Sequence, residues 1–107
     1  MDLGLKAKNA IIFGASSGLG RAAAHSLASE GCNTTLIARD SGKLKTVSKE
    51  ILQAHKVSSD YIVADLTKDH DVSSLLTGIS DRKYDILINN TGGPPPSNPI
   101  DIDSHAL

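Results

Sequence analysis

Three glycines follow an apolar run near the start of the chain, with the spacing Gly14-x-x-x-Gly18-x-Gly20. The apolar residues 10–13 precede them, and an alanine-rich helical pattern follows. This order predicts a strand, a tight turn and a helix, with glycine where φ is positive or where no side chain fits. The start of such a helix offers unpaired backbone N–H groups and the positive end of its dipole. The chemistry that this stretch predicts is the binding of a phosphate or pyrophosphate.

The small residues inside the turn have two interpretations. Ser16 and Ser17 are hydroxyl donors to a bound phosphate in one of them and simple turn formers in the other. The spacing also differs from the G-x-G-x-x-G pattern of the general dinucleotide fingerprint. We therefore infer phosphate binding from the glycines and the helix start that follows them, and not from a match to this fingerprint.

A second stretch, Ala38-Arg39-Asp40, ends the second predicted strand. Sites for NAD usually have a carboxylate there for the ribose hydroxyls, whereas sites for NADP have a guanidinium near the 2′-phosphate. Ala38 has no carboxylate to bind the ribose hydroxyls, whereas Arg39 has a guanidinium that can bind a 2′-phosphate. Asp40 is either the missing carboxylate or the cap of the next helix, and capping is favoured. The pattern therefore favours NADP over NAD.

Two more stretches follow the third and fourth predicted strands. Asp65, next to Leu66, either accepts a hydrogen bond from an adenine amino group or caps the next helix. Asn89 and Asn90 precede Gly92, and two amides before glycine indicate side chains that join neighbouring loops while the backbone passes close to a ligand. The alternative for this last stretch is an ordinary Asn/Gly turn.

The elements that position these residues alternate as strand and helix. The strands are apolar runs without a polar face, which is typical of a parallel sheet with helices on both sides. Right-handed crossovers predict an α/β, Rossmann-like doubly wound sheet with strand order 3-2-1-4, truncated after the fourth strand. Ligands of such sheets bind at the carboxyl ends, between strands one and four. The predicted strands are residues 10–13, 34–38, 61–64 and 86–88.

Helical spacing predicts which side chains face the sheet. We expect the first helix to end at Gly31 and the second to begin after Asp40 or Ser41 and to reach about His55. The predicted buried faces are Leu19, Ala22, Ala23, Ser26 and Leu27 in the first helix, Leu44, Val47, Ile51 and Leu52 in the second, and Val72, Leu75, Leu76 and Ile79 in the third.

Composition sets the remaining limits. The 107 residues make one domain at most, and the net charge of −1 gives no electrostatic reason to expect nucleic acid or a membrane surface as a partner. The single Cys32 excludes an intrachain disulfide, and no metal site is predicted.

The start of the chain has no apolar leader pattern, so a cytoplasmic location is expected. Residues 92–100 predict a stiff Pro/Gly-rich loop, and residues 101–107 the start of a truncated helix.

Taken together, these stretches resemble the short-chain dehydrogenase/reductase family over nearly the whole chain, with the nearest resemblance to bacterial 3-oxoacyl carrier-protein reductases. The resemblance implies a partial NAD(P)-binding Rossmann domain over residues 1–107, in which Gly14, Ser16, Gly18, Leu19 and Gly20 hold the pyrophosphate, Arg39 the 2′-phosphate, Asp65 and Leu66 the adenine, and Asn89 and Gly92 the adenosine side and the central sheet. It further implies hydride transfer between NADP(H) and a small carbonyl or alcohol substrate, in a full-length protein that forms a homo-oligomer.

The catalytic residues of that family are not assignable here. Family members use a Tyr proton donor, a Lys four residues later, a Ser and a helix Asn, and the resemblance places all of them after residue 107. Tyr61 and Tyr84 are not substitutes, because Asp65 and Ile88 stand four residues after them. We therefore expect the cofactor-binding part of an oxidoreductase, inactive alone. The alternative is a non-catalytic nucleotide-binding or interaction module; a methyltransferase would favour an acidic residue at Ala38.

Overall fold

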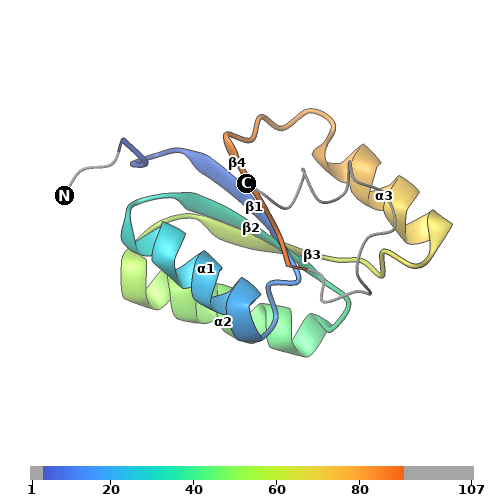
Figure 1. The fold of residues 1–107 in the computed structure, drawn as a ribbon, viewed down its shortest axis with the longest axis horizontal. Helices are drawn as coiled ribbons and strands as arrows, with labels where there is room; N and C mark the ends of the chain where they lie inside the picture. Colours follow the sequence, from blue (N-terminus) through green and yellow to red (C-terminus); the bar gives the residue numbers. More distant parts are fainter. Residues whose placement is uncertain (1–3, 91–107) are drawn as a thin grey trace.

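The computed structural model describes residues 4–90, which form one parallel sheet with helices on both faces (Figure 1). The strand order is β3-β2-β1-β4, and β1 pairs in parallel with both β2 and β4. The predicted α/β class and the strand order 3-2-1-4 are confirmed. Gly92, the predicted loop over residues 92–100 and the predicted helix start over residues 101–107 lie outside the described residues. The elements are β1 (Asn9–Phe13), α1 (Gly18–Ser29), β2 (Asn33–Ala38), α2 (Ser41–His55), β3 (Ser59–Val63), α3 (Asp69–Ile79) and β4 (Ile86–Asn89).

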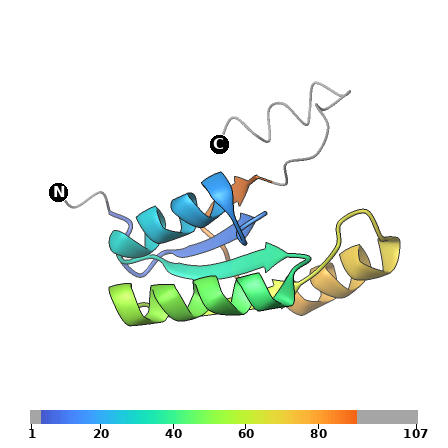
Figure 2. The same ribbon diagram turned by 90° about the horizontal axis from the view of Figure 1, so that it is seen from below.

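Alternate side chains of the central strands enter two different cores, as the period of two in a strand requires. Helices α1 and α2 run alongside the strands and cover one face (Figures 1 and 2), where Ile12 and Leu36 are fully buried. Helix α3 covers part of the other face, where Leu75 packs with Ile11 and Ile37. The sheet is therefore anchored on both sides at β1 and β2, the two strands that carry the glycine turn and Arg39.

Side chains join the strands at their amino ends. The backbone N–H of Asn9 donates to Asp85 Oδ2 (2.9 Å), and Asn33 Nδ2 donates to Asn9 Oδ1 (3.3 Å). The N–H of Ser58 then donates to Asn33 Oδ1 (3.1 Å). This amino-edge network links the starts of all four strands and fixes their register from one end of the sheet.

The buried helix faces differ from the predicted ones. In α1 the buried residues are Gly20, Ala24 and Ala28, while Leu19 is 77% exposed, because the helix turns its glycine toward the sheet. In α2, Leu52 is 47% exposed and Ser48 is buried in its place.

Ser48 is buried because its hydroxyl donates to the carbonyl of Ser59 (3.0 Å), which removes the cost of burying a polar group.

In α3, Leu75 is buried but Leu76 is 58% exposed. The expectation of strands covered on both faces is also wrong for β3, an edge strand of the described sheet, where Tyr61 and Val63 are 38% and 47% exposed.

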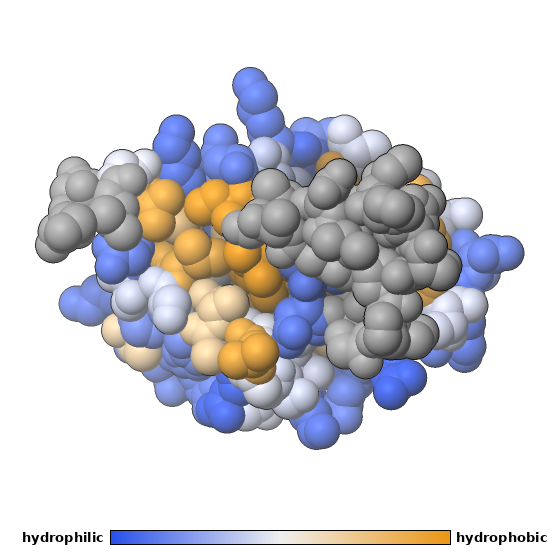
Figure 3. Space-filling model, in the orientation of Figure 1, coloured by the Kyte–Doolittle hydropathy of each residue, from blue (hydrophilic) through white to orange (hydrophobic). Residues whose placement is uncertain are grey.

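Apolar side chains gather over β1, β4 and α1 on the face seen in Figure 3. Ile86 and Ile88 of β4 are only partly buried against the α1–α2 core, and Leu87 is 39% exposed. Within residues 4–90, β4 pairs on one side alone, with β1. No helix in the described part of the chain combines the length and apolar character needed to cross a bilayer.

Gly20 allows α1 to touch the turn that precedes it. A Cβ built at Gly20 would overlap the carbonyl oxygen of Gly14 and lie 2.7 Å from its carbonyl carbon. Both atoms belong to the backbone, so they cannot move aside as a flexible side chain would. The helix therefore starts against the carboxyl end of β1 only because residue 20 has no side chain.

We predict that Gly20→Ala destabilises the fold by about 2 kcal/mol or more, because this overlap outweighs the gain of about 1 kcal/mol in helix propensity. Gly78→Ala is the matched control, since nothing lies within 4 Å of a Cβ built at that position in α3. The control is expected to hold or raise stability. Urea denaturation followed by circular dichroism measures both, and equal effects of the two variants would contradict the close-approach explanation.

Candidate cofactor-binding site

One groove of about 820 Å³ runs along the carboxyl ends of the strands. It brings together the ends of β1, β2, β3 and β4, which lie far apart in the sequence. Gly20 lies behind it, against Gly14. Its lining includes the sequence-predicted residues Gly14, Ser16, Ser17, Gly18, Leu19, Arg39, Asp65, Leu66, Asn89 and Asn90, together with Ile37, Ala38, Ala64 and Thr67.

The glycine turn is held open at the start of α1. Gly14 and Gly18 have φ values of 70° and 59°, which explains the need for glycine at both places. The N–H groups of Gly14 and Ala15 donate to the carbonyl of Ile37 (2.8 and 3.2 Å), so the turn is fixed to the end of β2. Ser17 occupies the N-cap position of α1, but its side chain makes no capping hydrogen bond. Its hydroxyl is therefore available to a ligand.

Asp40 and Asp65, which each had two interpretations from the sequence, have different partners. Asp40 caps α2, because its Oδ1 accepts from the N–H of Lys43 (3.0 Å), as the favoured interpretation had it. Asp65 does not cap α3, whose N-cap residue is Lys68. Instead, Asp65 Oδ1 accepts from the hydroxyl (2.6 Å) and the N–H (3.0 Å) of Thr67. This leaves Asp65 Oδ2 without a hydrogen-bond partner in the described chain.

The pKa of Asp65 is lowered, first by the Thr67 hydroxyl and then by the Thr67 N–H, with smaller contributions from the charges of Lys68 and Arg39. A carboxylate in this state accepts hydrogen bonds and donates none. The groove wall at Asp65 is therefore suited to a ligand that presents N–H donors.

The end of β4 contributes a buried amide. Asn89 Oδ1 is buried and has no hydrogen-bond partner within the described residues. A buried acceptor without a partner costs roughly 1–3 kcal/mol, so a group that donates to it is favoured. The neighbouring N–H of Asn90 donates to the carbonyl of Phe13 (3.0 Å), which fixes the strand end beside the glycine turn.

A second pocket of about 380 Å³ adjoins the groove and shares Ser16, Ser17 and Gly18 with it. Its other wall includes Arg21 of α1 and Lys43 of α2. Neither residue was predicted from the sequence as part of the site. The available signal was position: Arg21 follows the last glycine of the turn, and Lys43 lies one helical turn after the cap Asp40.

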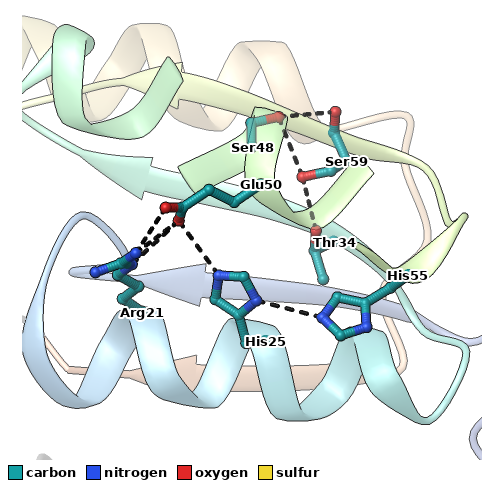
Figure 4. Close-up of polar contacts among 7 residues, drawn as sticks. All are labelled: Arg21, His25, Thr34, Ser48, Glu50, His55 and Ser59. Carbon is teal, nitrogen blue, oxygen red and sulfur yellow. Dashed lines mark hydrogen bonds and ion pairs between the residues drawn. The ribbon is translucent and has the colours of Figure 1, made fainter. Parts of the chain in front are cut away.

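Arg21 belongs to a polar cluster that joins α1 to α2 (Figure 4). Its Nη2 lies 2.8 and 2.7 Å from the two carboxylate oxygens of Glu50. His25 Nε2 lies 3.4 Å from Glu50 Oε1, and His25 Nδ1 lies 3.3 Å from His55 Nε2. The Arg21 hydrogen bond lowers the pKa of Glu50, and the contact with His25 lowers it further, although burial opposes both.

Neither tyrosine lies in the groove. Tyr84 donates its hydroxyl to Thr35 Oγ1 (3.1 Å) near the amino-edge network, at the opposite end of the sheet. Tyr61 lies on β3 and does not line the groove. Within residues 4–90, no group of three or more His, Cys, Asp or Glu side chains is placed to hold a metal ion.

The chain is similar to known proteins of one family. Residues 8–106 match the family described as short chain dehydrogenase, and the chain belongs to this family. It is 38% identical over 87 residues to a very-long-chain 3-oxoacyl-CoA reductase of Debaryomyces hansenii, across 79% of this chain and 25% of that protein. It is 39% identical over 84 residues to human inactive hydroxysteroid dehydrogenase-like protein 1, across 78% of this chain and 26% of that protein.

Solved structures give the same family. L-Sorbose reductase from Gluconobacter frateurii, complexed with NADPH and L-sorbose, superposes with a TM-score of 0.80 at 29% identity, over 94% of this chain and 39% of that one. The chain thus spans about a quarter of the length of the two curated relatives. The nearer resemblance to bacterial 3-oxoacyl carrier-protein reductases stays a prediction.

The Arg21–Glu50 pair predicts a pH-dependent contribution to stability. Because the pKa of folded Glu50 is below its ordinary value of 4.5, the stabilisation is present above about pH 4.5 and is lost as pH falls through the folded pKa. We expect Glu50→Gln to lower the urea midpoint at neutral pH, and the difference from the wild type to shrink in acid. Glu30→Gln is the control, since Glu30 has no ion pair in the described chain. A difference that persists unchanged in acid would contradict the ion-pair explanation.

Proposed function

We propose that the chain is the NADP(H)-binding part of an oxidoreductase that transfers hydride between NADP(H) and a small carbonyl or alcohol substrate. The observation that carries this proposal is the continuous groove that joins the glycine turn to Arg39, Asp65 and Asn89. Turnover would use a proton donor outside the described residues. The bound cofactor would supply the hydride chemistry, and this chain the position and the charges.

The residues of the groove suit a dinucleotide along its whole length. The open glycine turn and the uncapped start of α1 suit a pyrophosphate, because backbone N–H groups and the helix dipole favour negative charge there. The unpartnered Oδ2 of Asp65 suits the amino group of an adenine. Asn89 Oδ1 lacks a donor, and the adenosine side of a cofactor is one source of it.

Preference for NADP over NAD rests on the end of β2. Ala38 has no carboxylate to accept from a ribose 2′-hydroxyl, and Asp40 is occupied as the cap of α2. Arg39 is exposed and lines the groove, so its guanidinium is free to bind a 2′-phosphate. The solved structure of L-sorbose reductase with NADPH supports the same choice.

We predict that the purified chain binds NADPH more tightly than NADH, and that Arg39→Ala removes this preference. The loss in NADPH affinity is expected to be about thirtyfold, because a charge-assisted contact with phosphate contributes roughly 2 kcal/mol. NADH affinity should change by less than about twofold, since NADH has no 2′-phosphate. Cofactor fluorescence titrations measure all four constants.

Arg82→Ala is the control, because Arg82 pairs with Asp60 at the opposite end of the sheet. Binding is measured apart from turnover, because a human relative at 39% identity is described as inactive. Equal affinities of the wild type for the two cofactors would overturn the NADP assignment, and the absence of binding to either would overturn the proposed function itself.

A further inference from the structure

We propose that Lys43 is a second phosphate-binding residue for the cofactor, and that its ammonium faces Arg39 across the adenosine 2′-phosphate. This inference rests on the proposed function and assigns a further specificity-determining residue to the same site. It comes from the smaller pocket beside the glycine turn, to which Lys43 contributes from α2.

The smaller pocket continues the groove instead of forming a separate site. Ser16, Ser17 and Gly18 line both spaces, so the turn separates the pyrophosphate side from the α2 side. A ribose at the end of β2, with its pyrophosphate on the turn, would lie beside this boundary. Its 2′-substituent would then be within reach of both Arg39, which lines the groove, and Lys43, which lines the pocket.

Lys43 is held at this place by its backbone. Its N–H donates to Asp40 Oδ1 (3.0 Å), which fixes the first turn of α2 directly after the end of β2. Gly42 also lines the pocket and leaves room beside Lys43, because a glycine adds no side chain. The same cap therefore fixes the backbone position from which the Lys43 side chain extends into the pocket.

Arg21 and Thr46, two other polar residues of this pocket, already have partners within the chain. Arg21 is neutralised by Glu50 at 2.7 Å (Figure 4). The Thr46 hydroxyl donates to the carbonyl of Gly42 (3.0 Å). Lys43 has no ion pair in the described part of the chain.

What stays available is the ammonium of Lys43 and the hydroxyls of Ser16 and Ser17. A cation and a hydroxyl are the donors that a phosphate monoester with several unshared oxygens requires. A ribose hydroxyl would gain little binding free energy from an ammonium at this place. The pocket would therefore favour NADP over NAD.

The test uses adenosine 2′,5′-bisphosphate and AMP, two probes that differ by the 2′-phosphate alone. Isothermal titration calorimetry on the purified chain measures their affinities for the wild type, Lys43→Ala, Lys43→Arg and Lys45→Ala. Lys45 is the matched control: an exposed lysine of the same helix that does not line the pocket. Circular dichroism verifies that each variant is folded.

We expect Lys43→Ala to weaken the bisphosphate about tenfold and AMP less than twofold, which corresponds to the loss of one charge-assisted contact. Lys43→Arg should retain most of the affinity, and Lys45→Ala should match the wild type. An unchanged bisphosphate affinity in Lys43→Ala, or an equal loss for both probes, would overturn the inference.

The two proposals fail in distinguishable ways. If the wild type prefers the bisphosphate and Arg39→Ala removes that preference while Lys43→Ala does not reduce it, the role of Lys43 is wrong and the proposed function stands. If the wild type binds neither probe, the nucleotide site itself is wrong.

Discussion

The contact between Gly20 and the backbone of Gly14 is the constraint on which the rest of the structure depends. It places the first turn of α1 against the end of β1, and it determines which side of the helix faces the sheet. Because Gly20, Ala24 and Ala28 then form the buried stripe, α1 lies close to the strands and α2 can pack beside it. The first residues of α1, Gly18 and Leu19, therefore line the groove next to the turn. Fold and site therefore share one atomic requirement, the absence of a Cβ at residue 20.

The two ends of the sheet are built differently. At the amino ends, Asn9, Asn33 and Asp85 use side chains to link neighbouring strands. At the carboxyl ends, the side chains of Ser17 and Arg39 point to no partner within residues 4–90, and Asn89 Oδ1 is unpaired. Polar groups that bind one another hold the register, whereas groups without partners are those that a ligand can use. This division explains how a small sheet keeps a fixed register and still has a polar groove at one end.

Much of this arrangement could be predicted from the sequence, because it depends on local patterns. The strand order follows from alternation and handedness, and the cap at Asp40 follows from residue type. The rotation of α1 could not be predicted, because a tertiary contact at Gly20 overrides the apolar spacing that pointed to Leu19. Ser48 was missed because its burial depends on a hydrogen bond to Ser59, a residue on another element. Lys43 was missed for a related reason, since its relation to the glycine turn exists only once α2 packs beside α1.

The amino-edge network has a consequence for the dynamics of the sheet. At the starts of the strands, the N–H groups of Asn9 and Ser58 donate to the side chains of Asp85 and Asn33, which adds to the backbone pairing of the sheet. We therefore expect amide exchange at this edge to need a larger opening of the sheet. At the carboxyl ends, the N–H groups of Gly14 and Asn90 donate to backbone carbonyls of neighbouring strands instead, and we expect a lower local stability there. A ligand that occupies the groove would stabilise the carboxyl ends of the strands and would change the amino ends less. Hydrogen exchange would then slow first at the groove and next toward the centre of the sheet. Binding of a ligand in the groove would in this way make the strands more rigid along their length.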